Sequence, residues 1–422
     1  MRNVVRSADA FFLHVETAGA PQHVGGLVVF EPTGDGQPSV DQVCEVVRNE
    51  LVRLPRFRQR LARSSYWRRP RWVEADDIDW SSHVIERRTS DGLPELWGLV
   101  AAAAETPMAR DRPMWRIMLV PESGEGSAQP LPDRAGRAAM VLLVHHAIAD
   151  GNGIVSQALN LLRPRIELPR PSGAAPGRVR LAAATITGLA RLATDGGSGR
   201  PALASSPRRA FATADLDLGT VRLIATARHV RVTDVVLALV GEAVAGTYRD
   251  VTVRIGGRLR VAVPLTVRRA GIVAETNATA GVMVDVPVDG RPIEDLIAEV
   301  GRRTARVRTL SRAAASRFVL ATGLRALPEP AAAWFARTVY GRRFFHAIVS
   351  NMQGSRQPLS MAGVGIARVY PILPLAPGAP LAVGALSWAG TLGIGITTDP
   401  ASLDAAVLAA RIESTFSLLT SS

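Results

Sequence analysis

The sequence predicts a mixed α/β protein with two domains, and three observations support this. The chain has 422 residues, which exceeds one ordinary domain and suits two of about 200 residues each. Its 47% hydrophobic and 21% charged residues are typical of a chain that buries a large core. Expected strands and helices occur in both halves, and a stretch rich in Pro and Gly separates them. We therefore expect an N-terminal domain at 1–165, a linker with one helix at 166–212, and a C-terminal domain at 213–422.

In the first domain, residues 9–30 join a short apolar element to a strand at 24–30. A helix is expected at 39–54, because apolar residues keep helical spacing there and Ser39 with Gln42 forms a capping-box pattern. An arginine-rich loop at 56–72 follows and contains Tyr66. This loop could clamp phosphates, although a solvated basic face is the commoner role. The remaining elements expected here are a helix at 95–105, strands at 115–120 and 138–144, and a helix at 153–162.

The linker is expected to hold a helix at 179–192. The second domain should contain helices at 218–228, 233–248, 293–310 and 402–419, and strands at 258–263, 281–286, 345–350, 381–388 and 391–397. Thr233 is the expected N-cap of its second helix. Residues 369–398 carry no charge, but prolines and glycines interrupt them. They therefore predict buried strands and turns rather than a membrane span.

The charge and the rare residue types exclude several classes of function. The formal net charge is +13, and every basic residue is arginine, so lysine chemistry is excluded. A positive balance favours anionic partners, but nucleic acid is not expected because no recognition motif is present. The single cysteine, Cys44, excludes an internal disulfide framework and fits a reducing cytoplasm. Residues 1–9 contain no long apolar core typical of a signal peptide. We expect a cytoplasmic protein, soluble or peripheral to a membrane or lipid body.

The stretch from 138 to 154 carries the candidate chemistry, and it has the sequence AAMVLLVHHAIADGNGI. An apolar run typical of a buried strand ends at His145 and His146, and Asp150 and Gly151 follow. A histidine at a strand end can act as a general base near neutral pH. A serine nucleophile is disfavoured because no G-x-S-x-G segment occurs, and zinc because adjacent strand residues face opposite sides. The motif alone leaves a catalytic role and a core role open.

HHAIADG matches the HHxxxDG motif of the wax ester synthase/diacylglycerol acyltransferase family, and further blocks resemble that family in order. Residues 7–30 resemble its N-terminal stretch, and Pro113-Met114-Trp115 its PLW block. Thr233-Asp234 resembles its Asn-Asp motif, and 263–265 its Pro-containing strand end. Residues 350–354 (SNMQG) resemble its SNVPG segment, and 386–390 (LSWAG) its LSYAG segment. The family pattern is not matched at Thr233, Met114 and Met352-Gln353. These departures bear on the choice of acceptor, whereas the histidine motif is intact.

The resemblance implies two chloramphenicol-acetyltransferase-like domains with a tunnel between them. It implies that His146 is the general base and that His145 packs or hydrogen-bonds behind it. Asp150 would be an organiser paired with an arginine, and Gly151 would allow a tight turn. The candidate substrate-binding residues are Asn351 and Ser387, as possible oxyanion donors, and Trp115, for which a core position is the more expected role. No metal or cofactor is implied, and acyl-CoA enters as a substrate that the arginine-rich loop could attract.

The function expected from this resemblance is transfer of a long-chain acyl group from acyl-CoA to a fatty alcohol or a diacylglycerol. An alternative keeps the scaffold and changes the substrates: a natural-product acyltransferase or condensation enzyme that takes acyl groups from CoA or a carrier protein. A third possibility is a noncatalytic protein that retained the fold, which the intact motif argues against. The sequence does not identify the acceptor, the acyl chain length or the oligomeric state.

Overall fold

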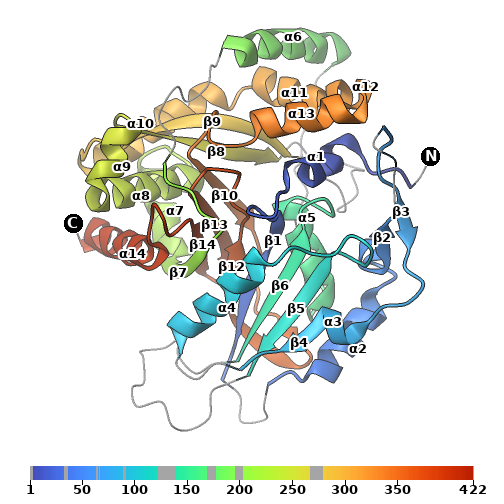
Figure 1. Ribbon diagram of the computed structural model, residues 1–422. Coiled ribbons are helices and arrows are strands. Elements are labelled where there is room, and N and C mark those ends of the chain that lie inside the picture. The colour runs from blue at the N-terminus through green and yellow to red at the C-terminus, as the bar shows by residue number, and fades with distance from the viewer. Residues whose placement is uncertain are drawn as a thin grey trace.

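The computed structural model describes residues 3–32, 37–62, 65, 67–88, 92–121, 138–168, 177–194, 203–266 and 279–421. Within these ranges the chain forms two six-stranded mixed sheets and a two-stranded ribbon, with helices packed around them (Figure 1). The predicted mixture of strands and helices in both halves is confirmed.

The first sheet has the strand order β11-β12-β1-β6-β5-β4. Its central strand β6 is buried throughout and pairs antiparallel with β1 and β5, so an uninterrupted apolar run suits it. The strands are β1 (His23–Phe30), β4 (Val84–Glu86), β5 (Trp115–Val120), β6 (Ala139–His145), β11 (Ser360–Met361) and β12 (Val364–Ile372); β2 (Gln59–Leu61) and β3 (Trp72–Glu74) form the ribbon.

The second sheet has the order β7-β14-β13-β10-β8-β9. β10 is parallel to both of its neighbours, and β13 and β14 form the predicted hairpin. The strands are β7 (Ala210–Asp217), β8 (Arg258–Thr266), β9 (Thr279–Pro287), β10 (Ala347–Gln353), β13 (Leu381–Trp388) and β14 (Thr391–Thr398).

Strand β12 joins the two halves of the chain. It follows β10 in the chain but pairs with β1 of the first sheet, and it also packs across β13 and β14. Glycines make this approach possible: a Cβ on Gly393 or Gly395 would collide with the carbonyl oxygens of Val369 and Pro371. Residues 360–372 therefore complete the first sheet, and the linker predicted at 166–212 overlaps β7.

The helices largely follow the predicted periodicity. The capping box of α2 is present, with Ser39 and Gln42 bonding each other's backbone N–H groups. Thr233 is not a cap, because α8 begins at Val232 and the Asp234 carboxylate accepts the Arg231 N–H instead. The other helices lie where Figure 1 labels them: α1 (Ser7–Val15), α2 (Val40–Glu50), α3 (Trp80–His83), α4 (Leu93–Glu105), α5 (Gly151–Ala158), α6 (Arg178–Thr194), α7 (Leu218–Ala227), α8 (Val232–Thr247), α9 (Arg249–Arg254), α10 (Ile293–Val307), α11 (Leu310–Phe318), α12 (Leu324–Ala326), α13 (Glu329–Val339) and α14 (Ala405–Ser421).

Candidate active site

His145 is the last residue of β6, and its side chain is fully buried. The Ala147 N–H donates to its Nδ1 at 3.0 Å, and its Nε2 lies 3.2 Å from Glu16 Oε1. Because Nδ1 accepts a hydrogen bond, the ring proton is on Nε2 and points to a carboxylate. His145 therefore has no ring nitrogen directed to a substrate, and the predicted position behind the site agrees with this geometry.

Glu16 follows α1 and gathers three donors around one carboxylate. Besides His145, it accepts hydrogen bonds from Arg110 Nη2 at 2.8 Å and from the Gln22 N–H at 3.2 Å. Burial raises the pKa of Glu16, but the hydrogen bond and proximity of His145, together with the bonds from Arg110 and Gln22, outweigh it and lower the pKa to about 2. A charged carboxylate thus holds His145 in place.

His23 lies opposite His145 on β1, with the two ring centroids 6.3 Å apart. Burial, and after it the proximity of His145, lowers the pKa of His23 to about 3, so this imidazole is neutral at physiological pH. Neither of its ring nitrogens has a hydrogen-bond partner among the residues that the structure describes. The back of the site is therefore a buried cluster in which the Glu16 carboxylate pairs with Arg110 and lies against the ring of His145.

His146 lies in different surroundings and is partly exposed. Its backbone N–H donates to the Gln22 carbonyl at 2.8 Å, which continues the ladder between β6 and the segment before β1. Its ring stacks on Phe12 of α1, with the centroids 3.6 Å apart and the planes 10° from parallel. Tyr340 meets Phe12 edge-on at 6.1 Å, next to the end of α13. His146 is thus an accessible imidazole fixed by its backbone and by one aromatic face.

Asp150 and Gly151 begin α5. The buried Asp150 carboxylate accepts the Gly153 N–H at 2.8 Å and caps the helix. Its pairing with an arginine stays a prediction. Gly151 is the first residue of α5, directly after the turn from β6, and its φ is not positive. The absence of a side chain lets Met352 of β10 pack closely against this residue, since a Cβ on Gly151 would lie 2.8 Å from Met352 Sδ.

Asn351 and Ser387 lie near the adjacent ends of β10 and β13 in the second sheet. Asn351 Nδ2 donates to Thr233 Oγ1 at 3.2 Å, so this amide connects two of the blocks that the sequence singled out. Ser387 Oγ accepts the Gly354 N–H at 3.3 Å, which leaves its own hydroxyl hydrogen available to donate. Met352 packs on Gly151, so these strand ends approach the histidine motif. An oxyanion role for either residue stays a prediction.

Trp115 lies in the core, which is the position that the sequence favoured for it over substrate binding. Its side chain is 2% exposed, and its Nε1 donates to the Phe57 carbonyl at 2.8 Å. It stacks between Phe57 and His83, with centroid distances of 5.0 and 4.3 Å. Its polar atom and both ring faces are thus occupied by protein.

The arginine-rich loop makes many contacts within the protein itself. Arg56 lies over the Trp72 ring, Arg58 and Arg60 pair with Glu74 and Asp76, and Arg69 pairs with Glu329. Tyr66 lies outside the described residues. These arginines thus bond to other parts of the protein surface, and phosphate binding by the loop stays a prediction.

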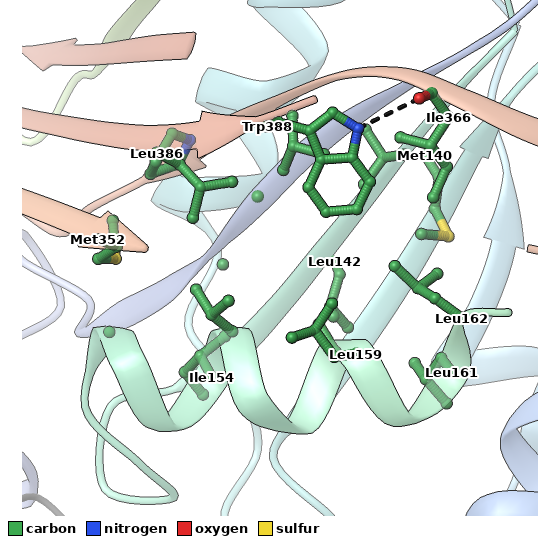
Figure 2. A pocket seen from close by; sticks show the side chains of 18 of the residues that line it. Met140, Leu142, Ile154, Leu159, Leu161, Leu162, Met352, Ile366, Leu386 and Trp388 are labelled. Atoms are coloured by element: carbon green, nitrogen blue, oxygen red, sulfur yellow. Dashed lines mark hydrogen bonds between the residues drawn. The ribbon is translucent and has the colours of Figure 1, made fainter. Parts of the chain in front are cut away.

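A narrow apolar cavity of about 70 Å³ begins at Gly151 and runs along α5 between the two halves (Figure 2). No charged side chain occurs among its described lining residues. Figure 2 shows Leu142 and Ile154 on one side, and Leu386 and Trp388 on the other, where Trp388 Nε1 donates to the Ile366 carbonyl at 3.2 Å. Met352 stands at the end next to Gly151. The segment that contains the histidine motif therefore lines part of the apolar cavity.

Comparison with known proteins decides the family. Residues 5–184 match the model of the wax ester synthase/diacylglycerol acyltransferase catalytic domain, and residues 276–420 match that of the WS/DGAT C-terminal domain. The chain belongs to the wax ester synthase/diacylglycerol acyltransferase family. The resemblance inferred from the sequence is thus confirmed, and the protein is an acyltransferase of this family.

Individual relatives agree with this assignment. The chain is 26% identical to the "Probable diacyglycerol O-acyltransferase tgs1" of Mycobacterium tuberculosis strain H37Rv, over 97% of this chain and 94% of the relative. Its fold is similar to that of the wax ester synthase/diacylglycerol acyltransferase from Marinobacter aquaeolei VT8, with a TM-score of 0.69, 22% identity, and coverage of 99% and 98% of the two chains. It is also similar to a starter condensation domain of rhizomide synthetase in complex with C8-CoA, with a TM-score of 0.61, 15% identity, and coverage of 99% and 93%. The predicted fold class is confirmed.

Sequence reasoning missed Glu16, Phe12 and Gln22, which together hold the histidines. All three lie within the block at 7–30 that resembles the family's N-terminal stretch, and this was the available signal. Glu16 is followed by a Gly- and Pro-containing turn, where a glutamate is normally expected to be solvated, so the local sequence did not predict its burial.

Proposed function

We propose that the protein transfers a long-chain acyl group from acyl-CoA to the hydroxyl of a fatty alcohol or a diacylglycerol, with His146 as the general base. The observation that supports this most is the apolar cavity that starts at Gly151, inside the HHxxxDG segment. Its apolar lining suits an alkyl chain, and Gly151 in that lining belongs to the same segment as His146. The same apolar lining disfavours the alternative function, in which a natural-product acyltransferase or condensation enzyme acts on a polar acceptor.

In the proposed reaction His146 takes the proton of the acceptor hydroxyl while its oxygen attacks the thioester carbonyl. The carbon–sulfur bond then breaks, an ester forms, and the proton passes from His146 to the departing CoA thiolate. A positioned base of this kind contributes roughly 10²- to 10⁴-fold in rate. The tetrahedral oxyanion needs a donor, and Ser387 is the better candidate because the Asn351 amide already donates to Thr233.

The test gives purified protein labelled palmitoyl-CoA with hexadecanol, with diacylglycerol, or with neither. We expect labelled ester with at least one acceptor and its loss in His146→Ala. His229→Asn, at an exposed position after α7, is the matched control and should retain activity. Ester formation that persists in His146→Ala would exclude His146 as the base, and absence of product from either acceptor would favour the alternative substrates.

The proposal includes peripheral association with a membrane or lipid body in the cytoplasm, because the proposed acceptors are lipids. No helix of the described residues is long and apolar enough to cross a membrane. The net charge of +13 favours contact with anionic surfaces. Co-sedimentation of the protein with lipid vesicles tests this association directly.

A further inference from the structure

Helix α6 presents an apolar stripe to solvent. Val179 and Ile186 are 85% and 70% exposed, and Ala183 and Ala190 are exposed as well. Their spacing of i, i+4, i+7 and i+11 places all four on one face of the helix, along about 16 Å. A helix on the surface of a soluble protein normally turns such a face to the core. The stripe therefore has the character of a surface made for a partner.

The packing of α6 fixes this orientation. Its opposite face contains Gly188, which is buried against α11, and a Cβ at Gly188 would collide with the Ser311 carbonyl and lie 2.7 Å from Ala315 Cβ. Figure 1 shows α6 at one end of the molecule, over α11 and near α13. The close contact with α11 needs the glycine side, so the apolar stripe faces away from the protein.

The charges around the stripe select the partner. Arg180 and Arg191 are exposed and lie about 100–120° round the helix from the stripe, on one flank, where Arg191 Nη1 also donates to Ser311 Oγ of α11 at 3.4 Å. Residues 178–194 contain no Asp or Glu, and neither does α11. Trp334 of α13, in the same group of helices, is 69% exposed. An apolar stripe flanked by arginine, without acidic residues, is typical of helices that lie in the interface of an anionic membrane.

We infer that α6 docks on the surface of an anionic phospholipid bilayer, with Val179 and Ile186 among the headgroups and its exposed arginines against phosphate. The inference rests on the proposed function, since it concerns how lipid substrates reach the site. Residues 319–326, which follow α11 and include α12, pack on α1, which carries the Phe12 that stacks on His146. Docking through α6 would thus bring the side of the molecule that carries Phe12 close to the lipid.

The experiment measures co-sedimentation of the full chain with phosphatidylcholine vesicles, with and without phosphatidylglycerol. We expect binding that depends on phosphatidylglycerol and falls about tenfold in Val179→Asp/Ile186→Asp. Val253→Asp on α9 is the matched control, because Val253 is 79% exposed and lies away from α6, and it should bind like wild type. Arg180→Gln/Arg191→Gln should lose the preference for phosphatidylglycerol without loss of the apolar stripe.

Failure of wild type to bind, or binding by Val179→Asp/Ile186→Asp equal to wild type, would overturn the inference. A shift in oligomeric state in that variant, without a change in vesicle binding, would also overturn it, in favour of a second copy of this chain as the partner. Transfer from a short-chain acyl-CoA to a water-soluble alcohol should be unchanged in the variant. A protein that binds vesicles through α6 but transfers no acyl group would overturn the proposed function and support the docking surface.

Discussion

His145 and His146 are adjacent in sequence and lie in opposite surroundings. His145 is fully buried, with Nδ1 accepting a backbone N–H and Nε2 directed to Glu16. His146 is partly exposed and is held by its backbone and by Phe12. Adjacent strand residues face opposite sides, so a single strand end supplies both an internal support and an accessible base. The environment, not the residue type, divides the two roles.

The sharpest way to break this comparison is the same substitution at each position. His146→Gln should lower kcat by roughly 10²- to 10⁴-fold with little change in melting temperature, because the lost group is the base and the site is partly exposed. His145→Gln should instead lower the free energy of unfolding by about 2 kcal/mol or more, because buried hydrogen bonds lose their fitted partner. Acyl-transfer kinetics and urea unfolding of both variants measure the difference. Equal stability losses at the two positions would contradict it.

Glu16→Gln tests whether the support behind His145 matters for His146. An amide offers one oxygen where the two carboxylate oxygens now accept from three donors, so at least one of His145, Gln22 and Arg110 loses its partner. We expect a loss of about 2–3 kcal/mol in the free energy of unfolding and about tenfold in kcat, through misplacement of His146.

The exposed Glu45→Gln on α2 is the matched control and should change neither quantity. The double variant Glu16→Gln/His145→Gln should lose less than the sum of the single losses if Glu16 acts through His145. Additive losses would mean that Glu16 acts by another route. Since the pKa of Glu16 is lowered to about 2, its stabilising effect is present above about pH 4.5 and is lost as the pH falls towards 2.

His23 makes stability depend on pH at the back of the site. Its pKa falls from 6.5 to about 3 on folding, chiefly because the imidazole is buried, with His145, Glu16 and Arg116 as the neighbouring titratable or charged groups. The unfolded chain therefore binds a proton that the folded chain does not, and stability falls as the pH drops from 6.5 towards 3. Between pH 7 and pH 5 this costs about 2 kcal/mol. In His23→Leu that part of the pH dependence should vanish in urea unfolding at the two pH values. A variant with the same pH dependence as wild type would assign the effect elsewhere.

The sequence predicted the elements whose evidence is local. The apolar run of β6, the α2 capping box and the β13–β14 hairpin all follow from neighbouring residues. What it missed depends on contacts between distant segments. β12 pairs with β1 across more than 300 residues of chain, and the glycines that admit it, Gly393 and Gly395, have no local signature of that contact.

The same distinction applies to the site. His145, His146 and Asp150 stand out because they follow one strand end, and the structure places them together at β6 and α5. Glu16 is found only when folding brings the segment after α1 against that strand. The reason for Gly151 likewise lies elsewhere in the chain, in the side chain of Met352.

The contact between Gly151 and Met352 gives the mildest test, and it concerns the wall of the apolar cavity. Gly151→Ala should lower activity only a few-fold, because the Cβ would press on the flexible end of Met352 and shift it into the cavity. Met352→Ala removes that pressure, so Gly151→Ala/Met352→Ala should recover most of the activity and accept bulkier chains than wild type. Rates with acyl-CoA substrates of increasing length measure both effects. If Met352→Ala fails to rescue Gly151→Ala, Gly151 is required for the start of α5 itself. The loss of activity would then not come from pressure on the cavity wall.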